Sequence, residues 1–86
     1  MTWLWPDGTP VEVTLSQDGV PLAFTWRNRT HRLTEIALRW RVDEGWWRGE
    51  GHAWREYWKV CVDTGLLVVI YRDLLTDRWY LQRLYD

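Results

Sequence analysis

An alternating apolar segment interrupted by a turn constrains this sequence most. It spans residues 58–72, WKVCVDTGLLVVIYR. β-Branched residues alternate on both sides of DTG, and the glycine suits the left-handed position of a three-residue hairpin loop. The segment therefore predicts a β-hairpin that turns at Gly65. In its register, Trp58 lies opposite Ile70 and Val60 opposite Val68, so one face is wholly apolar and is expected to lie on the core.

Residues 22–35, LAFTWRNRTHRLTE, predict a second hairpin. Its turn is expected at Asn28 and Arg29, because asparagine tolerates the positive φ of a tight turn. The expected pairs are Trp26 with His31 and Phe24 with Leu33. The opposite face is then polar and basic, and it includes Arg27 and Arg32.

The alternation changes phase after Leu33, which predicts a β-bulge or bend near Glu35. A helix over residues 34–40 is the competing interpretation, but the period of two from Ile36 to Asp43 is the cleaner pattern. A closing strand is expected over residues 78–85 and an edge strand over residues 11–16. Together these segments predict an all-β fold, a single small antiparallel barrel or strongly curled sheet of about 6–7 short strands.

Length and composition limit the functions to consider. A chain of 86 residues forms one domain, and its net charge of −1 gives no general attraction to nucleic acid or anionic lipid. No apolar run approaches the roughly 20 residues of a membrane span, and no secretory signal is recognisable, so a cytoplasmic protein without membrane contact is expected. The single cysteine, Cys61, lies in an apolar run and is expected to be structural.

Catalytic and metal-binding patterns are sparse. The chain has one serine, Ser16, and neither a nucleophile motif nor a phosphate-binding glycine loop. His31, His52 and Cys61 are not at metal-ligand spacing. The expectation is a protein that is not an enzyme, with no cofactor and no metal site.

Tryptophan and arginine are the unusual residues. The chain has nine tryptophans, and residues 24–59 carry eight of its eleven basic side chains. Trp40 and Trp58 follow apolar strand faces and are expected in the core, whereas Trp46, Trp47 and Trp54 lie among glycines and charges in an expected loop. Exposed rings stack on bases and guanidinium groups hold phosphates in single-strand binding proteins. The candidate binding residues are Trp46, Trp47, Arg48, Trp54, Arg55, Arg27, Arg29 and Arg32.

The motifs FTWRNRTHR, WW, WREYWKV and RWYL carry a family resemblance. Residues 24–86 resemble a small bacterial family of unknown function and also the carboxy-terminal segment of ImuB-type proteins, which are inactive Y-family polymerase homologues. This leaves residues 1–23 as a variable amino-terminal edge of the single domain, residues 1–86. The polymerase-like body is absent, so no nucleotidyl-transfer residue can be assigned.

The resemblance implies a non-enzymatic accessory role in DNA repair, in damage tolerance or translesion synthesis. The expected partners are single-stranded or distorted DNA, or a mutasome or polymerase protein. The alternative is a protein-interaction or homodimerisation module that uses the aromatic loop without DNA binding. Glu44, Glu50 and Glu56 lie among the loop tryptophans and favour this alternative.

Overall fold

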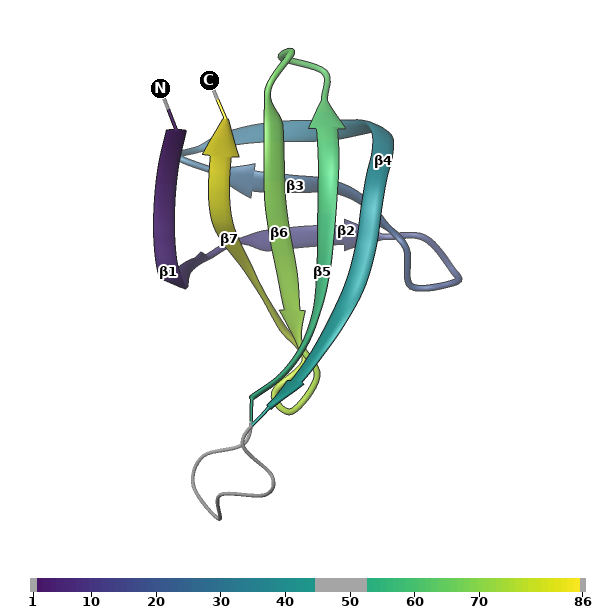
Figure 1. The fold of residues 1–86 in the computed structure, drawn as a ribbon. Coiled ribbons are helices and arrows are strands. Elements are labelled where there is room, and N and C mark those ends of the chain that lie inside the picture. The colour runs from purple at the N-terminus through teal and green to yellow at the C-terminus, as the bar shows by residue number, and fades with distance from the viewer. Residues whose placement is uncertain (1, 45–52, 86) are drawn as a thin grey trace.

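The computed structural model describes residues 2–44 and 53–85, which form one antiparallel sheet of seven strands in the order β1-β7-β6-β5-β4-β3-β2 (Figure 1). The expectation of an all-β fold is confirmed. The strands are β1 (Thr2–Pro10), β2 (Glu12–Leu15), β3 (Pro21–Trp26), β4 (Arg29–Glu44), β5 (Ala53–Val62), β6 (Leu67–Asp73) and β7 (Arg78–Tyr85).

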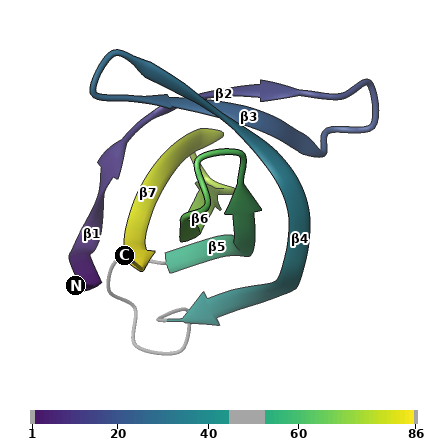
Figure 2. The same cartoon turned by 90° about the horizontal axis from the view of Figure 1, so that it is seen from above.

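The sheet is strongly curled, and its two edge strands, β1 and β2, follow each other directly in the chain (Figure 2). β1 pairs with β7 as far as Pro10, and β2 pairs with β3 from Glu12 onward. Only Val11 lies between them, and its N–H donates to the carbonyl of Trp79 at 3.2 Å. No ladder joins β1 to β2 in the described residues, so the fold is a strongly curled sheet and not a closed barrel.

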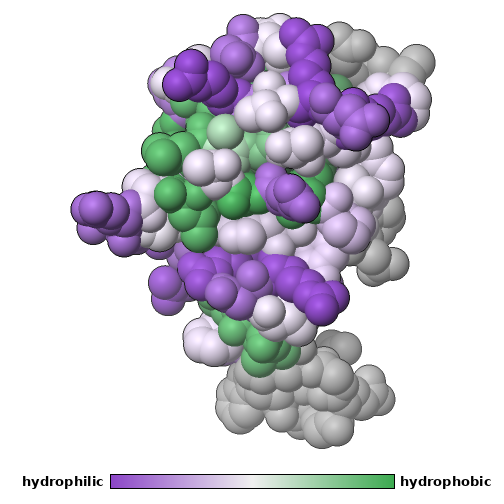
Figure 3. All heavy atoms as spheres, turned by 180° about the vertical axis from the view of Figure 1, so that it is seen from behind, coloured by the Kyte–Doolittle hydropathy of each residue, from purple (hydrophilic) through white to green (hydrophobic). Residues whose placement is uncertain are grey.

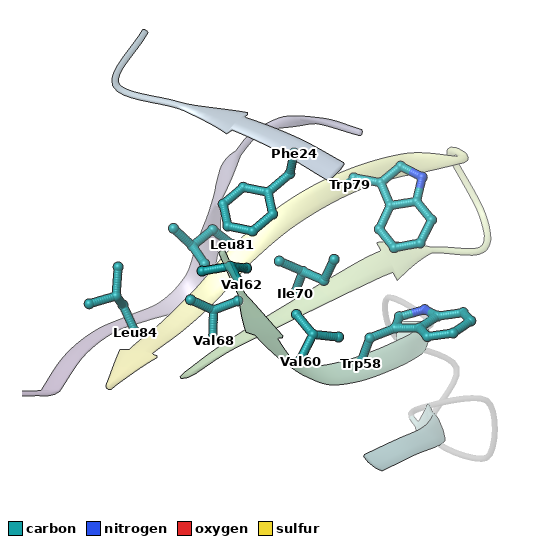
Figure 4. Packing of buried hydrophobic residues seen from close by; sticks show 9 residues of the cluster. All are labelled: Phe24, Trp58, Val60, Val62, Val68, Ile70, Trp79, Leu81 and Leu84. Carbon is teal, nitrogen blue, oxygen red and sulfur yellow. The ribbon is translucent and has the colours of Figure 1, made fainter. Parts of the chain in front are cut away.

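The β5–β6 hairpin has the predicted register. Trp58 pairs with Ile70 and Val60 with Val68, and the turn glycine, Gly65, has φ 86°. The predicted apolar face lies in the core, where side chains of β3, β5, β6 and β7 converge inside the curl (Figure 4). The buried cluster is Phe24, Trp58, Val60, Val62, Val68, Ile70, Trp79, Leu81 and Leu84.

The predicted register of the β3–β4 hairpin was wrong. The turn consists of Arg27 and Asn28, with φ 51° and 62°, instead of Asn28 and Arg29. Two successive positive φ angles are typical of the type I′ turn, whose twist matches that of the flanking strands. Phe24 therefore pairs with His31 and not with Leu33. Because the shift is two residues, each side chain keeps its predicted face, and the Phe24 and His31 rings stack at 5.0 Å.

β4 contains the predicted irregularity. Its pairing with β5 shifts between Leu33 and Glu35 and again between Ile36 and Leu38, so the bulge prediction is confirmed and the helical alternative is wrong. These shifts occur where β4 stops pairing with β3 and begins to pair with β5. The strand has 16 residues, whereas short strands were expected. The predicted closing strand is β7, whereas β1 was not predicted as a strand.

Candidate functional site

The predicted binding residues fall into separate parts of the molecule. Trp46, Trp47 and Arg48 lie outside the described residues, in the chain segment that joins β4 to β5. Trp54 and Arg55 belong to the start of β5 and not to the loop in which Trp54 was expected. Arg27, Arg29 and Arg32 are exposed on the β3–β4 hairpin.

The hairpin arginines and the start of β5 lie at opposite ends of the sheet. The N–H of Asp63, just beyond β5, donates to the carbonyl of Arg32 at 2.9 Å. Trp54 is at the other end of that ten-residue strand, which corresponds to a separation of about 25–30 Å. In Figure 1 the β3–β4 hairpin is at the top and the start of β5 at the bottom. Of the predicted residues that the structure describes, the hairpin arginines and Trp54 therefore do not come together into one site.

A different set of arginines gathers on the concave face, near the end of β5 where Trp54 lies. The register pairs Arg41 with Glu56 and Arg39 with Trp58. Because side chains alternate along a strand, Glu56 and Trp58 face the inside of the curl together with their two partners. We call these four residues, Arg39, Arg41, Glu56 and Trp58, the Glu56 cluster.

Glu56 holds both arginines through one oxygen. Arg39 donates to Glu56 Oε2 from Nε at 3.3 Å and from Nη2 at 2.9 Å, and Arg41 donates to the same atom from Nε at 2.9 Å. The Glu56 side chain is only 5% exposed, whereas those of Arg39 and Arg41 are 50% and 62% exposed. A buried carboxylate thus fixes two guanidinium groups on side chains that are half or more exposed.

The charge of Glu56 depends on these two partners. Burial alone would raise the pKa of Glu56, but the hydrogen bonds and charges of Arg39 and Arg41 outweigh burial and lower that pKa below its ordinary value. The cluster therefore retains one negative and two positive charges at neutral pH. Among these four residues positive charge exceeds negative charge by one, and Asp43, which pairs with Trp54, places a further carboxylate on the same face.

A tryptophan ring packs against Arg39, and a second ring packs against the first. The Arg39 guanidinium lies 4.3 Å from the centroid of the Trp58 ring, and the Trp79 ring lies 6.3 Å from that of Trp58. Trp58 Nε1 is buried with no hydrogen-bond partner in the described part of the chain. Trp54, 38% exposed, precedes Glu56 by two residues and is therefore directed to the same face. Arg72, opposite Glu56 on β6, forms an ion pair with Asp77.

Arg55 lies on the opposite, convex face. Its guanidinium is 4.6 Å from the centroid of the Tyr71 ring, and its Nη1 donates to the Tyr57 hydroxyl at 3.4 Å, which raises the pKa of Arg55. Neighbouring rings in a row across four strands, Trp40, Tyr57, Tyr71 and Tyr80, have centroids 5.0–5.2 Å apart. Trp40 was expected in the core, but it is half-buried in this second cluster, whereas Trp58 is fully buried as predicted.

Arg27 forms a third arginine–aromatic contact, at the hairpin tip. Its guanidinium lies 4.6 Å from the centroid of the Trp26 ring, which packs edge-on against Trp5 at 5.7 Å.

The Glu56 cluster was not predicted from the sequence, because the candidate residues were sought in an exposed loop and not on a strand. The available signal was the spacing of Arg39 and Arg41, which places both on one face of a strand.

Residues 2–44 and 53–85 contain no group of three histidine, cysteine, aspartate or glutamate side chains arranged to hold a metal ion. They also contain no helix that meets the length and hydropathy needed to cross a bilayer.

The fold and this surface define a small all-β domain that presents arginine–tryptophan contacts on the concave face of a curled sheet. The model of a family described as a domain of unknown function (DUF6504) matches residues 8–86, and the chain belongs to this family. No curated protein and no solved structure matches the chain.

Proposed function

We propose that this domain is a non-enzymatic binding module that contacts single-stranded or distorted DNA through the concave face around the Glu56 cluster. The observation that carries the proposal is the fixation of Arg39 and Arg41 by one buried carboxylate. A guanidinium that is already oriented loses less side-chain entropy when it binds a phosphate. Two such groups at alternate positions of one strand, and so on one face, suit a phosphodiester backbone better than a single small anion.

Tryptophan beside these arginines supports a single strand over a duplex. Base stacking on an aromatic ring contributes about 1 to 3 kcal/mol per base and requires an unpaired base. Trp54 is a partly exposed ring of this face, and Trp46, Trp47 and Arg48 follow β4 in the sequence segment that leads to it. Figure 3 views the molecule from this side, and a band of hydrophilic side chains crosses its lower half.

The biological setting of the proposal rests on resemblance. Residues 24–86 resemble the carboxy-terminal segment of ImuB-type polymerase homologues, which favours a role in DNA damage tolerance or translesion synthesis. In that setting the domain acts as an accessory to a catalytic partner and carries out no reaction of its own. A bacterial cytoplasmic location belongs to the same proposal.

The direct test is fluorescence anisotropy with labelled single-stranded, forked and duplex oligonucleotides of one sequence. We expect micromolar binding at low salt, tightest for the single strand and the fork. Arg41→Ala should weaken binding about three- to tenfold, because it removes one phosphate contact and leaves the Arg39–Glu56 pair in place. Arg29→Ala, the same charge change at the far end of the sheet, should have no effect. Equal binding by wild type and Arg41→Ala would reject this face as the DNA site.

Protein binding is the second candidate function, and a separate surface favours it. Leu22 and Ile36 are exposed and line a surface hollow with the half-buried Val20 and Leu33, and the exposed Leu15 pairs with Pro21 of the same hollow. These residues come from β2, β3 and the bend of β4, and Figure 3 shows a hydrophobic area on this side. Contiguous exposed apolar side chains are typical of protein contacts. A module that binds protein here and no DNA would leave the Glu56 cluster with a structural role.

A further inference from the structure

The outer edge of β1 is an unprotected strand edge. Within residues 2–44 and 53–85, β1 pairs with β7 on one side only and ends the sheet order, and Figures 1 and 2 draw no described strand beyond it. Its first residues, Thr2 to Trp5, carry no charge. Free backbone N–H and C=O groups along an uncharged edge form a template for another strand.

Both faces of this edge also carry an exposed apolar side chain. Trp3 is 45% exposed and pairs with Leu84, whose side chain faces the core, while Leu4 is 51% exposed and pairs with Arg83 on the convex face. The Trp3 ring stacks on Trp5 at 6.4 Å, which holds it beside the strand. A strand added here would therefore find an apolar neighbour above and below the sheet.

The other edge of the sheet lacks these features. β2 has four residues, and Glu12 and Thr14 place a charge and a hydroxyl among its exposed side chains. A short edge with a charged side chain resists the addition of a strand. Of the two sheet edges, β1 is therefore the one at which we expect another strand to add.

A second copy of β1 is the occupant that matches this edge. Two antiparallel copies related by a two-fold axis through the sheet keep Trp3 of both copies on one face and Leu4 of both on the other. No charged side chain lies opposite another in the paired segment, because residues 2–5 are uncharged. The backbone pattern is self-complementary, so pairing requires no second sequence.

We propose that the domain forms a two-fold homodimer by antiparallel pairing of its β1 edges at Thr2–Trp5, which joins the two curled sheets into one. The contact is small, so the dissociation constant is on the order of tens of micromolar. This interface is distinct from the Glu56 cluster, and it requires no DNA.

Sedimentation velocity of the whole chain in reducing buffer, from about 1 to 300 μM, tests the dimer. Wild type should shift from monomer to dimer across this range. Leu4→Lys should weaken dimerisation at least about tenfold, because the two-fold brings both new charges into one contact. Thr14→Lys, which adds the same charge to the β2 edge, should dimerise like wild type. If thermal unfolding shows that Leu4→Lys is not folded, Thr2→Lys takes its place.

Hydrogen exchange at low and high protein concentration locates the contact independently of mutation. Amides of residues 2–5 should gain protection at high concentration, and those of residues 12–15 should not. A protein that stays monomeric at 300 μM, or a dimer that Leu4→Lys leaves intact, overturns the proposal. Concentration-dependent protection only at residues 15–36 would also overturn it and would assign self-association to the apolar surface of Leu15, Leu22 and Ile36.

Discussion

Glu56 is the residue on which the geometry of the concave face depends. Its charge holds two arginines that would otherwise repel each other, so Glu56→Gln, which keeps the shape and removes the charge, should destabilise the fold by about 1 to 3 kcal/mol at pH 7. Urea unfolding of both proteins measures this difference. Glu35→Gln, at an exposed carboxylate, should stay within about 0.5 kcal/mol of wild type.

The effect of Glu56→Gln should depend on pH in one direction. The pKa of Glu56 is lowered in the folded state, so the stabilisation is fully present above the unfolded value of 4.5 and is lost as pH falls through the lower folded pKa. The difference in stability between wild type and Glu56→Gln should therefore shrink as pH falls below 4.5. A difference that stays constant from pH 7 to pH 3 would show that the glutamate charge is not its source.

Gly8 occupies a position where only glycine fits. Its φ is 76°, and a Cβ atom would lie 2.7 Å from Tyr80 Cβ and 2.8 Å from the Tyr71 hydroxyl oxygen. Gly19 is a matched control, with φ 79° and open space around it. Both alanine variants incur the backbone penalty of positive φ, about 1 kcal/mol, but Gly8→Ala should lose about 1 to 3 kcal/mol more through the clash. Thermal unfolding compares the two, and equal losses would contradict the close approach of β1 to Tyr71 and Tyr80.

Among the elements, the β5–β6 hairpin contributes the centre of the core. Val68 on β6 is completely buried between strands, so Val68→Ala should destabilise the protein by about 1 to 3 kcal/mol through lost burial and the cavity left behind. Thr76→Ala, in the exposed turn before β7, is the control. Chemical denaturation measures this loss of unfolding free energy, and the m-value should be unchanged. A cost below about 0.5 kcal/mol would mean that Val68 is not in the core.

The two hairpins differ in how far the sequence determined them. For β5–β6, glycine in DTG fixes the turn, and alternation on both sides fixes the register. For β3–β4, the string WRNRT offers two adjacent positions for a two-residue turn, and asparagine is compatible with either. Arg27 takes a positive φ, which residues other than glycine rarely adopt. In this conformation its guanidinium contacts the Trp26 ring. That contact depends on tertiary packing against Trp5, which local pattern does not contain.

At the scale of the whole molecule, a strongly curled all-β sheet could be predicted, but strand β1, which ends that sheet, could not. Strand β1 was missed because TWLWPDGTP contains proline and glycine and has no period-two pattern. Its pairing with β7 joins the two ends of the chain, a contact no local signal reports. In the candidate site, the spacing of Arg39 and Arg41 predicts that both lie on one face of a strand, but their contact with Glu56 could not be predicted, since the β4 bulges set the register with β5.

The charge of the whole molecule sets the last prediction, because a net charge of −1 leaves only local clusters to attract DNA. If the concave face makes about three to five phosphate contacts, the logarithm of the single-strand binding constant should fall against the logarithm of salt with a slope of about −2 to −3.5. Arg41→Ala should reduce the slope by about 0.7, and Arg29→Ala should not change it. Titration of tryptophan fluorescence with an unlabelled single strand, between about 20 and 200 mM salt, measures both, since stacked rings are quenched. If wild type shows no salt-sensitive binding at tens of micromolar, the DNA proposal fails and the apolar surface of Leu15, Leu22 and Ile36 becomes the functional one.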